Sequence, residues 1–199
     1  SLHSVSKGFL GECGHRGGYA EFRNLPGDVM AEFIKLQSIS LCANLTGQIA
    51  TLMMVSPPQP GDASHPTYVR ERDAILGELK EKAEILGRGI NAIEGMCLDV
   101  PQGAMYAFVR FTLPREKGSD PASMAPAERQ AYEAKRDSDY CLALLEETGI
   151  CVVPGSGFGQ EPGTLHFRTT FLPPKPEIEE LVKMLRSFHE KYVRRPAKA

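Results

Sequence analysis

Apolar residues recur at helical spacing over a long central stretch of this chain. Between about residues 66 and 95 the gaps between successive apolar positions are 3, 4, 3, 4 and 3, which places these side chains on one face of a helix. The pattern predicts one continuous amphipathic helix of about 28 residues, which is long for a globular protein. Such a helix either packs along a core or connects two domains, and both interpretations stay open. The apolar residues of this face are Leu76, Leu79, Ala83, Leu86, Ile90 and Ile93.

Shorter helical patterns alternate with β-rich runs along the rest of the chain. Further helices are expected over residues 28–40, around Ile49 to Met53, over 126–147 and over 176–193. Short strands are expected over residues 2–6, 19–23, 97–100, 105–112, 150–153 and 164–170. This alternation of helices and strands indicates an α/β or α+β fold.

A cluster of prolines marks the expected domain boundary. Residues 56–61 read Ser-Pro-Pro-Gln-Pro-Gly, and prolines at these positions cannot continue the preceding helix. The sequence therefore predicts one unit over residues 1–60 and a second over 61–199, the latter beginning with the long helix.

Composition and charge narrow the class of protein. The chain has 199 residues, of which 42% are hydrophobic and 24% charged, and its net charge is -2. Basic and acidic residues are nearly equal in number, 23 against 25, so we expect no nucleic-acid partner. No run approaches the roughly 18 apolar residues of a membrane-spanning helix, so we expect no membrane partner. The five cysteines form no C-x-x-C pair, which favours reduced, mostly buried thiols in a cytosol-like compartment.

The first candidate site surrounds Lys7. Residues 4–19 read S-V-S-K-G-F-L-G-E-C-G-H-R-G-G-Y, with one lysine among hydroxyl residues and glycines and with Arg16 nine positions later. A lysine amine can bind an aldehyde covalently, while hydroxyls and a guanidinium can hold a phosphate. These are the groups that covalent binding of pyridoxal phosphate requires. The alternative is a solvated lysine in a glycine-rich surface loop.

The second candidate site is Arg168, in the run Thr164 to Pro173. This guanidinium interrupts a half-apolar strand between Phe167 and Phe171, and burying it is costly unless an anion pairs with it. Its planar set of donors suits a carboxylate. The alternative is an arginine on an edge strand that faces water.

Two further patterns are weaker than these. The run Gly155-Ser-Gly-Phe-Gly159 lacks the ending of a nucleotide-binding loop, so we interpret it as a tight loop that brings the backbone beside a ligand or a helix. Cys13 and His15 lack a second cluster of ligands, so no metal site is predicted.

Taken together, these segments resemble the alanine aminotransferases, which are pyridoxal-phosphate enzymes of fold-type I. The resemblance covers essentially the whole chain, and the matching motifs occur in the family's order. They are the segment at 4–19, P-Q-G-A-M-Y at 101–106, V-V-P-G-S-G-F-G at 152–159 and H-F-R-T-T-F-L-P at 166–173. The resemblance implies the end of a large cofactor-binding domain and a small α/β C-terminal domain, joined by the long helix.

The resemblance also implies a role for each candidate residue. Lys7 would be the Schiff-base lysine and the general base. Ser4 and Arg16 would hold the cofactor phosphate, with Ser6 as a further contact. Arg168 would bind the substrate α-carboxylate, for which a planar fork of donors is better suited than a lysine.

The implied reaction transfers an amino group between L-alanine and 2-oxoglutarate, giving pyruvate and L-glutamate. The family forms homodimers, so a homodimer is expected, with the turn at residues 41–47 as a contact. The alternatives are a glutamate–glyoxylate aminotransferase, more distantly a lyase related to 1-aminocyclopropane-1-carboxylate synthase, and a non-catalytic scaffold of the same fold.

The same resemblance implies that this chain is the C-terminal part of an enzyme. The family's other cofactor contacts precede the lysine, so the 199-residue chain alone is expected to have little or no activity. A cytoplasmic location is expected, with a mitochondrial one left open.

Overall fold

The computed structural model describes residues 1–114, 121 and 123–195, and within them the chain divides into two compact units. The first unit is Ser1–Leu76 and the second is Gly77–Ala199, so the division lies inside the long helix and not at the proline cluster. The assignment of residues 1–60 and 61–199 to a large and a small domain stays a prediction. No helix among the described residues has both the length and the apolar character needed to cross a bilayer.

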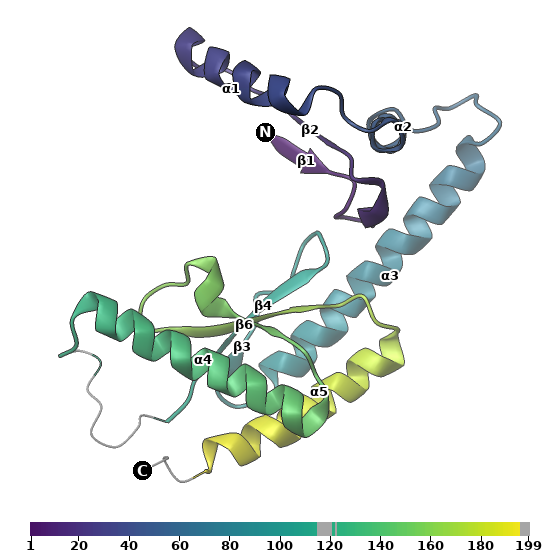
Figure 1. Ribbon diagram of the computed structural model, residues 1–199. Coiled ribbons are helices and arrows are strands. Elements are labelled where there is room, and N and C mark those ends of the chain that lie inside the picture. The colour runs from purple at the N-terminus through teal and green to yellow at the C-terminus, as the bar shows by residue number, and fades with distance from the viewer. Residues whose placement is uncertain (115–120, 122, 196–199) are drawn as a thin grey trace. The chain divides into compact units, whose positions relative to one another are not determined.

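The first unit is a two-stranded antiparallel ribbon accompanied by two helices (Figure 1). Ser4 on β1 pairs with Gly18 on β2 in this ribbon. The helices form where the 3.6-residue patterns predicted them, although the strands are shorter than expected. The elements are β1 (Leu2–Ser4), η1 (Cys13–His15), β2 (Gly18–Ala20), α1 (Gly27–Ser40) and α2 (Leu45–Val55).

The large apolar side chains of α1 and α2 are largely exposed in this chain. Leu36 and Ile39 are 64% and 79% exposed, and Leu52 and Met53 on α2 are 60% and 66% exposed. Helical periodicity therefore located these helices, while the described residues do not bury their apolar side chains.

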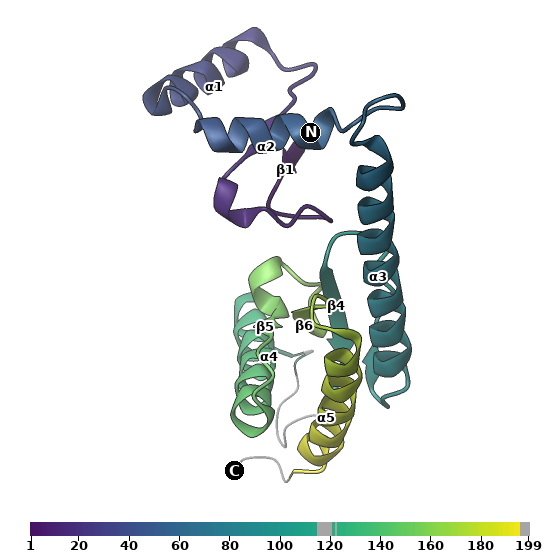
Figure 2. The same cartoon turned by 90° about the vertical axis from the view of Figure 1, so that its right-hand side faces the viewer.

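The second unit is a four-stranded antiparallel sheet with the strand order β3-β4-β6-β5. One face of this sheet packs on three helices, and α5 lies between α3 and α4 (Figure 2). The opposite face carries Tyr106, Phe108, His166 and Arg168, which share one side because strand residues alternate between faces. The elements are α3 (His65–Asn91, which begins in the first unit), β3 (Met96–Cys97), β4 (Tyr106–Phe111), α4 (Pro126–Thr148), β5 (Val153–Pro154), η2 (Gly155–Phe158), β6 (Leu165–Thr170) and α5 (Lys175–Val193).

The core of the second unit is formed by the predicted face of α3 together with the inner faces of the strands. Leu86 and Ile90 are 1% and 0% exposed, and they belong to one cluster with Val109, Phe167 and Leu185. Gly89 lets α3 approach α5 closely, because a Cβ there would lie 2.6 Å from Val182. The packing interpretation of the long helix is thus confirmed within this unit.

Two sequence expectations are wrong in the structure. The expected strand at residues 150–153 is confined to Val153–Pro154 on the sheet edge. The thiols are mostly exposed and not buried: all five cysteines are free, and only Cys141 is buried. Cys97 pairs with Arg110 and shares its exposed face of the sheet, and Cys13 and Cys42 lie in the first unit, where few side chains are buried.

Candidate functional site

Lys7 lies in a tight loop that begins directly after β1. The strand ends at Ser4, and the next two residues, Val5 and Ser6, are buried. The Val5 backbone N–H donates to the Gly17 carbonyl at 3.1 Å, and Glu12 donates back to the Val5 carbonyl at 2.9 Å. These two bonds close the loop, so the exposed Lys7 side chain is carried by a backbone that is fixed on both sides.

The two serines predicted as cofactor contacts lie on either side of Val5. The Ser6 backbone N–H donates to Ser4 Oγ at 3.1 Å. Since a hydroxyl also carries one O–H, Ser4 can still donate to an anion. The Ser6 carbonyl accepts a bond from Cys13 Sγ at 3.2 Å, which ties the loop to η1.

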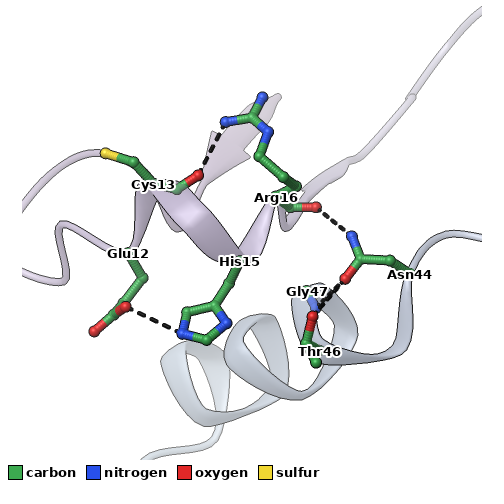
Figure 3. A network of polar contacts seen from close by, with 7 residues as sticks. All are labelled: Glu12, Cys13, His15, Arg16, Asn44, Thr46 and Gly47. Carbon is green, nitrogen blue, oxygen red and sulfur yellow. Dashed lines mark hydrogen bonds and ion pairs between the residues drawn. The ribbon is translucent and has the colours of Figure 1, made fainter.

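Arg16 directly follows η1, and its backbone has the left-handed conformation, with φ 52°. One guanidinium nitrogen donates to the Cys13 carbonyl at 3.2 Å, and the side chain is otherwise exposed (Figure 3). Because an arginine has five N–H donors, most of them remain available to an anion. The pairing of Ser4 with Gly18 puts Arg16, two residues before Gly18, beside the end of β1.

A residue that the sequence analysis missed holds this loop against α2. The Asn44 side-chain amide donates to the Arg16 carbonyl at 2.9 Å, while its oxygen accepts from the Gly47 backbone N–H at 2.7 Å and so caps the helix (Figure 3). Gly47 lies so close that a Cβ there would be 2.7 Å from the Arg16 carbonyl oxygen. The N-cap position of Asn44 in the sequence was a readable signal, but its contact with Arg16 was not.

The groups around Lys7 fit a ligand with an aldehyde and a phosphate. A primary amine, a hydroxyl and a guanidinium lie in or beside one closed loop, and Gly17 and Gly18 bring the backbone close. A Cβ on Gly18 would be 2.4 Å from the His3 carbonyl oxygen. Ser4, Lys7 and Arg16 could therefore hold pyridoxal phosphate in the way that the sequence predicts.

Arg168 lies on β6, in the second unit, and its guanidinium lies over two aromatic rings. The guanidinium carbon lies 4.7 Å from the centre of the Tyr106 ring and 4.6 Å from that of Phe158. The side chain is half-buried, and no acidic side chain forms an ion pair with it among the residues the structure describes. Two rings can hold a planar cation by its faces while its N–H edge stays available to a carboxylate.

The edge-strand alternative for Arg168 is excluded, because β6 lies between β4 and β5. Phe108 on β4 and Val153 on β5 are its direct neighbours in the sheet. The contacts with Tyr106 and Phe158 could not be foreseen, since they depend on the strand register and on the fold of the loop at η2.

The glycine-rich loop at residues 155–159 packs on a helix, which was one of the two predicted options. The Ser156 backbone N–H donates to the buried carboxylate of Asp137 on α4 at 2.8 Å. Next to this loop, burial and the nearby positive charge of Arg110 lower the pKa of His166.

Comparison with known proteins finds relatives over nearly the whole chain, although no family model matches it. It is 48% identical over 193 residues to a probable mitochondrial alanine aminotransferase of Dictyostelium discoideum, covering 97% of this chain and 35% of the relative. It is 44% identical to the mitochondrial alanine aminotransferase 2 of Arabidopsis thaliana, covering 97% of this chain and 34% of that relative. The chain thus spans about a third of the length of these proteins.

The chain is also similar to solved structures. The alanine aminotransferase of Pyrococcus furiosus matches with a TM-score of 0.70 and 27% identity, over 96% of this chain and 42% of that one. The predicted fold, the C-terminal part of a fold-type I aminotransferase, is confirmed. The expected cytoplasmic location is wrong, because the relatives from Dictyostelium and Arabidopsis are named mitochondrial.

Proposed function

We propose that this chain, which is homologous to the alanine aminotransferases and corresponds to their C-terminal part, contributes the cofactor-binding lysine and the substrate-binding arginine of such an enzyme. The reaction would transfer the amino group of L-alanine to 2-oxoglutarate. The observation that carries the proposal is the state of Arg168: it is half-buried, its guanidinium lies over two aromatic rings, and it has no acidic partner among the described residues. A site of this kind needs an anion, and both substrates carry a carboxylate.

The cofactor would be held by residues of the first unit. Ser4 would donate its hydroxyl to the phosphate, Arg16 would neutralise part of the phosphate charge, and Lys7 would attach the cofactor through its amine. Ser6 is nine-tenths buried beside them and is the further contact that we assign. When bound, pyridoxal phosphate supplies the electron sink that makes the substrate Cα–H acidic.

The chain's own residues would then bind the substrate and move one proton. Arg168 would orient the substrate through two parallel N–H bonds to its carboxylate. The amine of Lys7 would act as the general base that takes and holds the proton from the substrate Cα. The same two residues would serve the 2-oxo acid in the second half of a ping-pong cycle.

The test is an assay of the full-length protein that contains this chain, loaded with pyridoxal phosphate. With L-alanine and 2-oxoglutarate we expect pyruvate formation, and parallel lines in double-reciprocal plots at several oxo-acid concentrations. A higher kcat/KM with L-glutamate and glyoxylate would contradict the substrate assignment and favour a glutamate–glyoxylate aminotransferase. Absence of any transamination would favour the scaffold.

We also propose that the full-length protein is a homodimer with residues 41–47 at the interface. Leu41 and Leu45, within this segment, are 81% and 70% exposed, which supports burial against another surface. Light scattering on the full-length protein should give twice the chain mass. A monomer mass at micromolar concentration would contradict the proposal.

A further inference from the structure

Asp137 is a carboxylate buried inside the second unit without a basic partner among the described residues. It lies on α4 and is 0% exposed, and no Lys or Arg in the described part of the chain forms an ion pair with it. Burying an ionised carboxylate costs several kcal/mol unless hydrogen bonds replace its hydration. The groups that donate hydrogen bonds to Asp137 therefore indicate its role.

The loop at residues 156–160 supplies three hydrogen bonds to Asp137. Oδ2 accepts from the Ser156 backbone N–H at 2.8 Å and from Gln160 Nε2 at 3.0 Å. Oδ1 accepts from Ser156 Oγ at 3.1 Å. The Asp137 side chain thus binds both ends of the 156–160 loop. This loop carries Phe158, whose ring is one of the two that contact the Arg168 guanidinium.

A second path leads from Asp137 to Arg168 through Gln160. The Gln160 side-chain oxygen lies 3.1 Å from His166 Nδ1, and the His166 ring stacks on Phe108 with 4.6 Å between centroids and 6° between planes. Phe108 pairs with Arg168 across the sheet. It also meets the edge of Phe158, with 5.9 Å between the ring centroids.

We propose that Asp137 is a positioning residue for the substrate carboxylate, acting through the 156–160 loop on Phe158 and thereby on the guanidinium of Arg168. The inference rests on the proposed role of Arg168. Phe158 is 46% exposed, so packing alone does not fix its ring. An arginine that is already held flat loses less conformational entropy when it binds a carboxylate, which lowers the substrate concentration needed for half-saturation.

Replacing Asp137 by asparagine can keep its hydrogen bonds while removing its negative charge. In Asp137→Asn the amide oxygen can accept the two N–H bonds, and its NH2 group can donate to Ser156 Oγ. In Asp137→Ala all three bonds are lost. Asp139→Ala is the matched control, because Asp139 is a more accessible aspartate on the same helix.

The experiment measures steady-state kinetics of the full-length protein loaded with pyridoxal phosphate. For Asp137→Ala we expect KM to rise at least about tenfold for both the amino acid and the oxo acid, with kcat changed less than about threefold. The inhibition constant of glutarate, a carboxylate without the reacting group, should rise in parallel. Asp137→Asn should stay within about threefold of the wild type and Asp139→Ala should match it. A rise in KM for Asp137→Asn equal to that for Asp137→Ala would overturn the proposal.

A double-mutant cycle tests whether the effect passes through Phe158. If it does, Asp137→Ala/Phe158→Leu should have the KM of the more impaired single variant and not the product of the two effects. A multiplicative result would overturn the proposal. If Asp137→Ala does not fold, Gln160→Met in the same cycle removes the amide contacts with Asp137 and His166 while keeping the side-chain length.

Hydrogen exchange separates this inference from the proposed function. Asp137→Ala should speed exchange of the amides at residues 156–160, whereas Asp139→Ala should not. An unchanged exchange rate would overturn the inference even in an active enzyme. A wild-type protein without transaminase activity would instead refute the proposed function.

Discussion

Arg168 on β6 stacks on Tyr106 of β4, with the guanidinium carbon 4.7 Å from the ring centre. The two residues are diagonal neighbours, because Tyr106 pairs with Thr170 and Phe108 pairs with Arg168. The sheet register therefore places the Tyr106 ring against the Arg168 guanidinium. The loop at η2 places the Phe158 ring against the same guanidinium. A planar guanidinium suits this arrangement better than an ammonium group does.

Arg168→Lys in the full-length protein should therefore be strongly impaired, although it keeps the charge. The variant loses the bidentate bond and the stacking, and a hydrogen bond to a charged group contributes about 1.5–3 kcal/mol. At about 1.4 kcal/mol for each factor of ten, kcat/KM should fall by about 10- to 100-fold, mostly through KM. Steady-state kinetics with L-alanine measure this.

Arg110→Lys is the control for that variant. Arg110 is an exposed arginine on the same sheet, opposite His166 on the neighbouring strand. Its replacement should leave kcat/KM within about twofold of the wild type. Equal losses in both variants would mean that the loss is not specific to Arg168, and would contradict its proposed role.

Gly47→Ala should weaken cofactor binding. A Cβ at this position would lie 2.7 Å from the Arg16 carbonyl oxygen and 2.8 Å from that of His15, so the loop that carries Arg16 must move. Overpacking of this kind costs about 1–3 kcal/mol, which outweighs the roughly 1 kcal/mol that alanine normally adds in a helix. Titration with pyridoxal phosphate should show half-saturation at a higher concentration, by up to about 30-fold.

Gly77→Ala is the same substitution at a position where it should stabilise the protein. Gly77 lies in α3, and a Cβ added there would meet no atom within 4 Å, so the helix propensity of alanine should dominate. The urea midpoint of the full-length protein should rise slightly, and cofactor binding should not change. If Gly47→Ala behaved like Gly77→Ala, the contact between α2 and the Arg16 loop would be unimportant for cofactor binding.

His189 should make the protein less stable as the pH falls below neutral. It is 2% exposed, and its Nδ1 lies 3.0 Å from the buried Tyr140 hydroxyl. Burial lowers the pKa of His189 below its ordinary value of about 6.5, so the unfolded chain takes up a proton before the folded one does. The stabilisation is complete above about pH 7 and is lost as the pH falls through 6.5 towards the lower folded value.

Thermal unfolding midpoints of wild type and His189→Gln between about pH 7.5 and 5 test this. Glutamine can still bond to the Tyr140 hydroxyl but does not titrate, so its midpoint should fall less steeply with acidification. His3→Gln, in an exposed residue of β1, should follow the wild type. Parallel curves for wild type and His189→Gln would contradict the assignment.

Periodic patterns in the sequence were sufficient to locate the helices. The long helix was expected from about 66 to 95 and runs over His65–Asn91, and the last one was expected over 176–193 and runs over Lys175–Val193. These helices bury one face, so the spacing of apolar residues reports them directly. The strand expected at residues 150–153 was misplaced, because a short edge strand is defined by its partner and not by its own pattern.

The candidate site could be predicted only in part, for a related reason. The residue types of Lys7, Arg16 and Arg168 suggested their chemistry, and their motifs suggested the family. The contacts that support them join positions far apart in the chain, such as Asn44 with Arg16 and Asp137 with Ser156. Such pairs depend on tertiary packing, which local propensity does not determine.

The central claim is that Lys7 binds pyridoxal phosphate in an aminotransferase, and one spectrum tests it most directly. Full-length wild-type protein and Lys35→Ala, a control in an exposed lysine of α1, should both give the absorption band of an imine on addition of the cofactor, at a longer wavelength than the free cofactor absorbs. Lys7→Ala should lack this band and should lose at least about 10²-fold in kcat, since it lacks both the covalent attachment and the general base. A Lys7→Ala protein with an unchanged band and unchanged turnover would contradict the account.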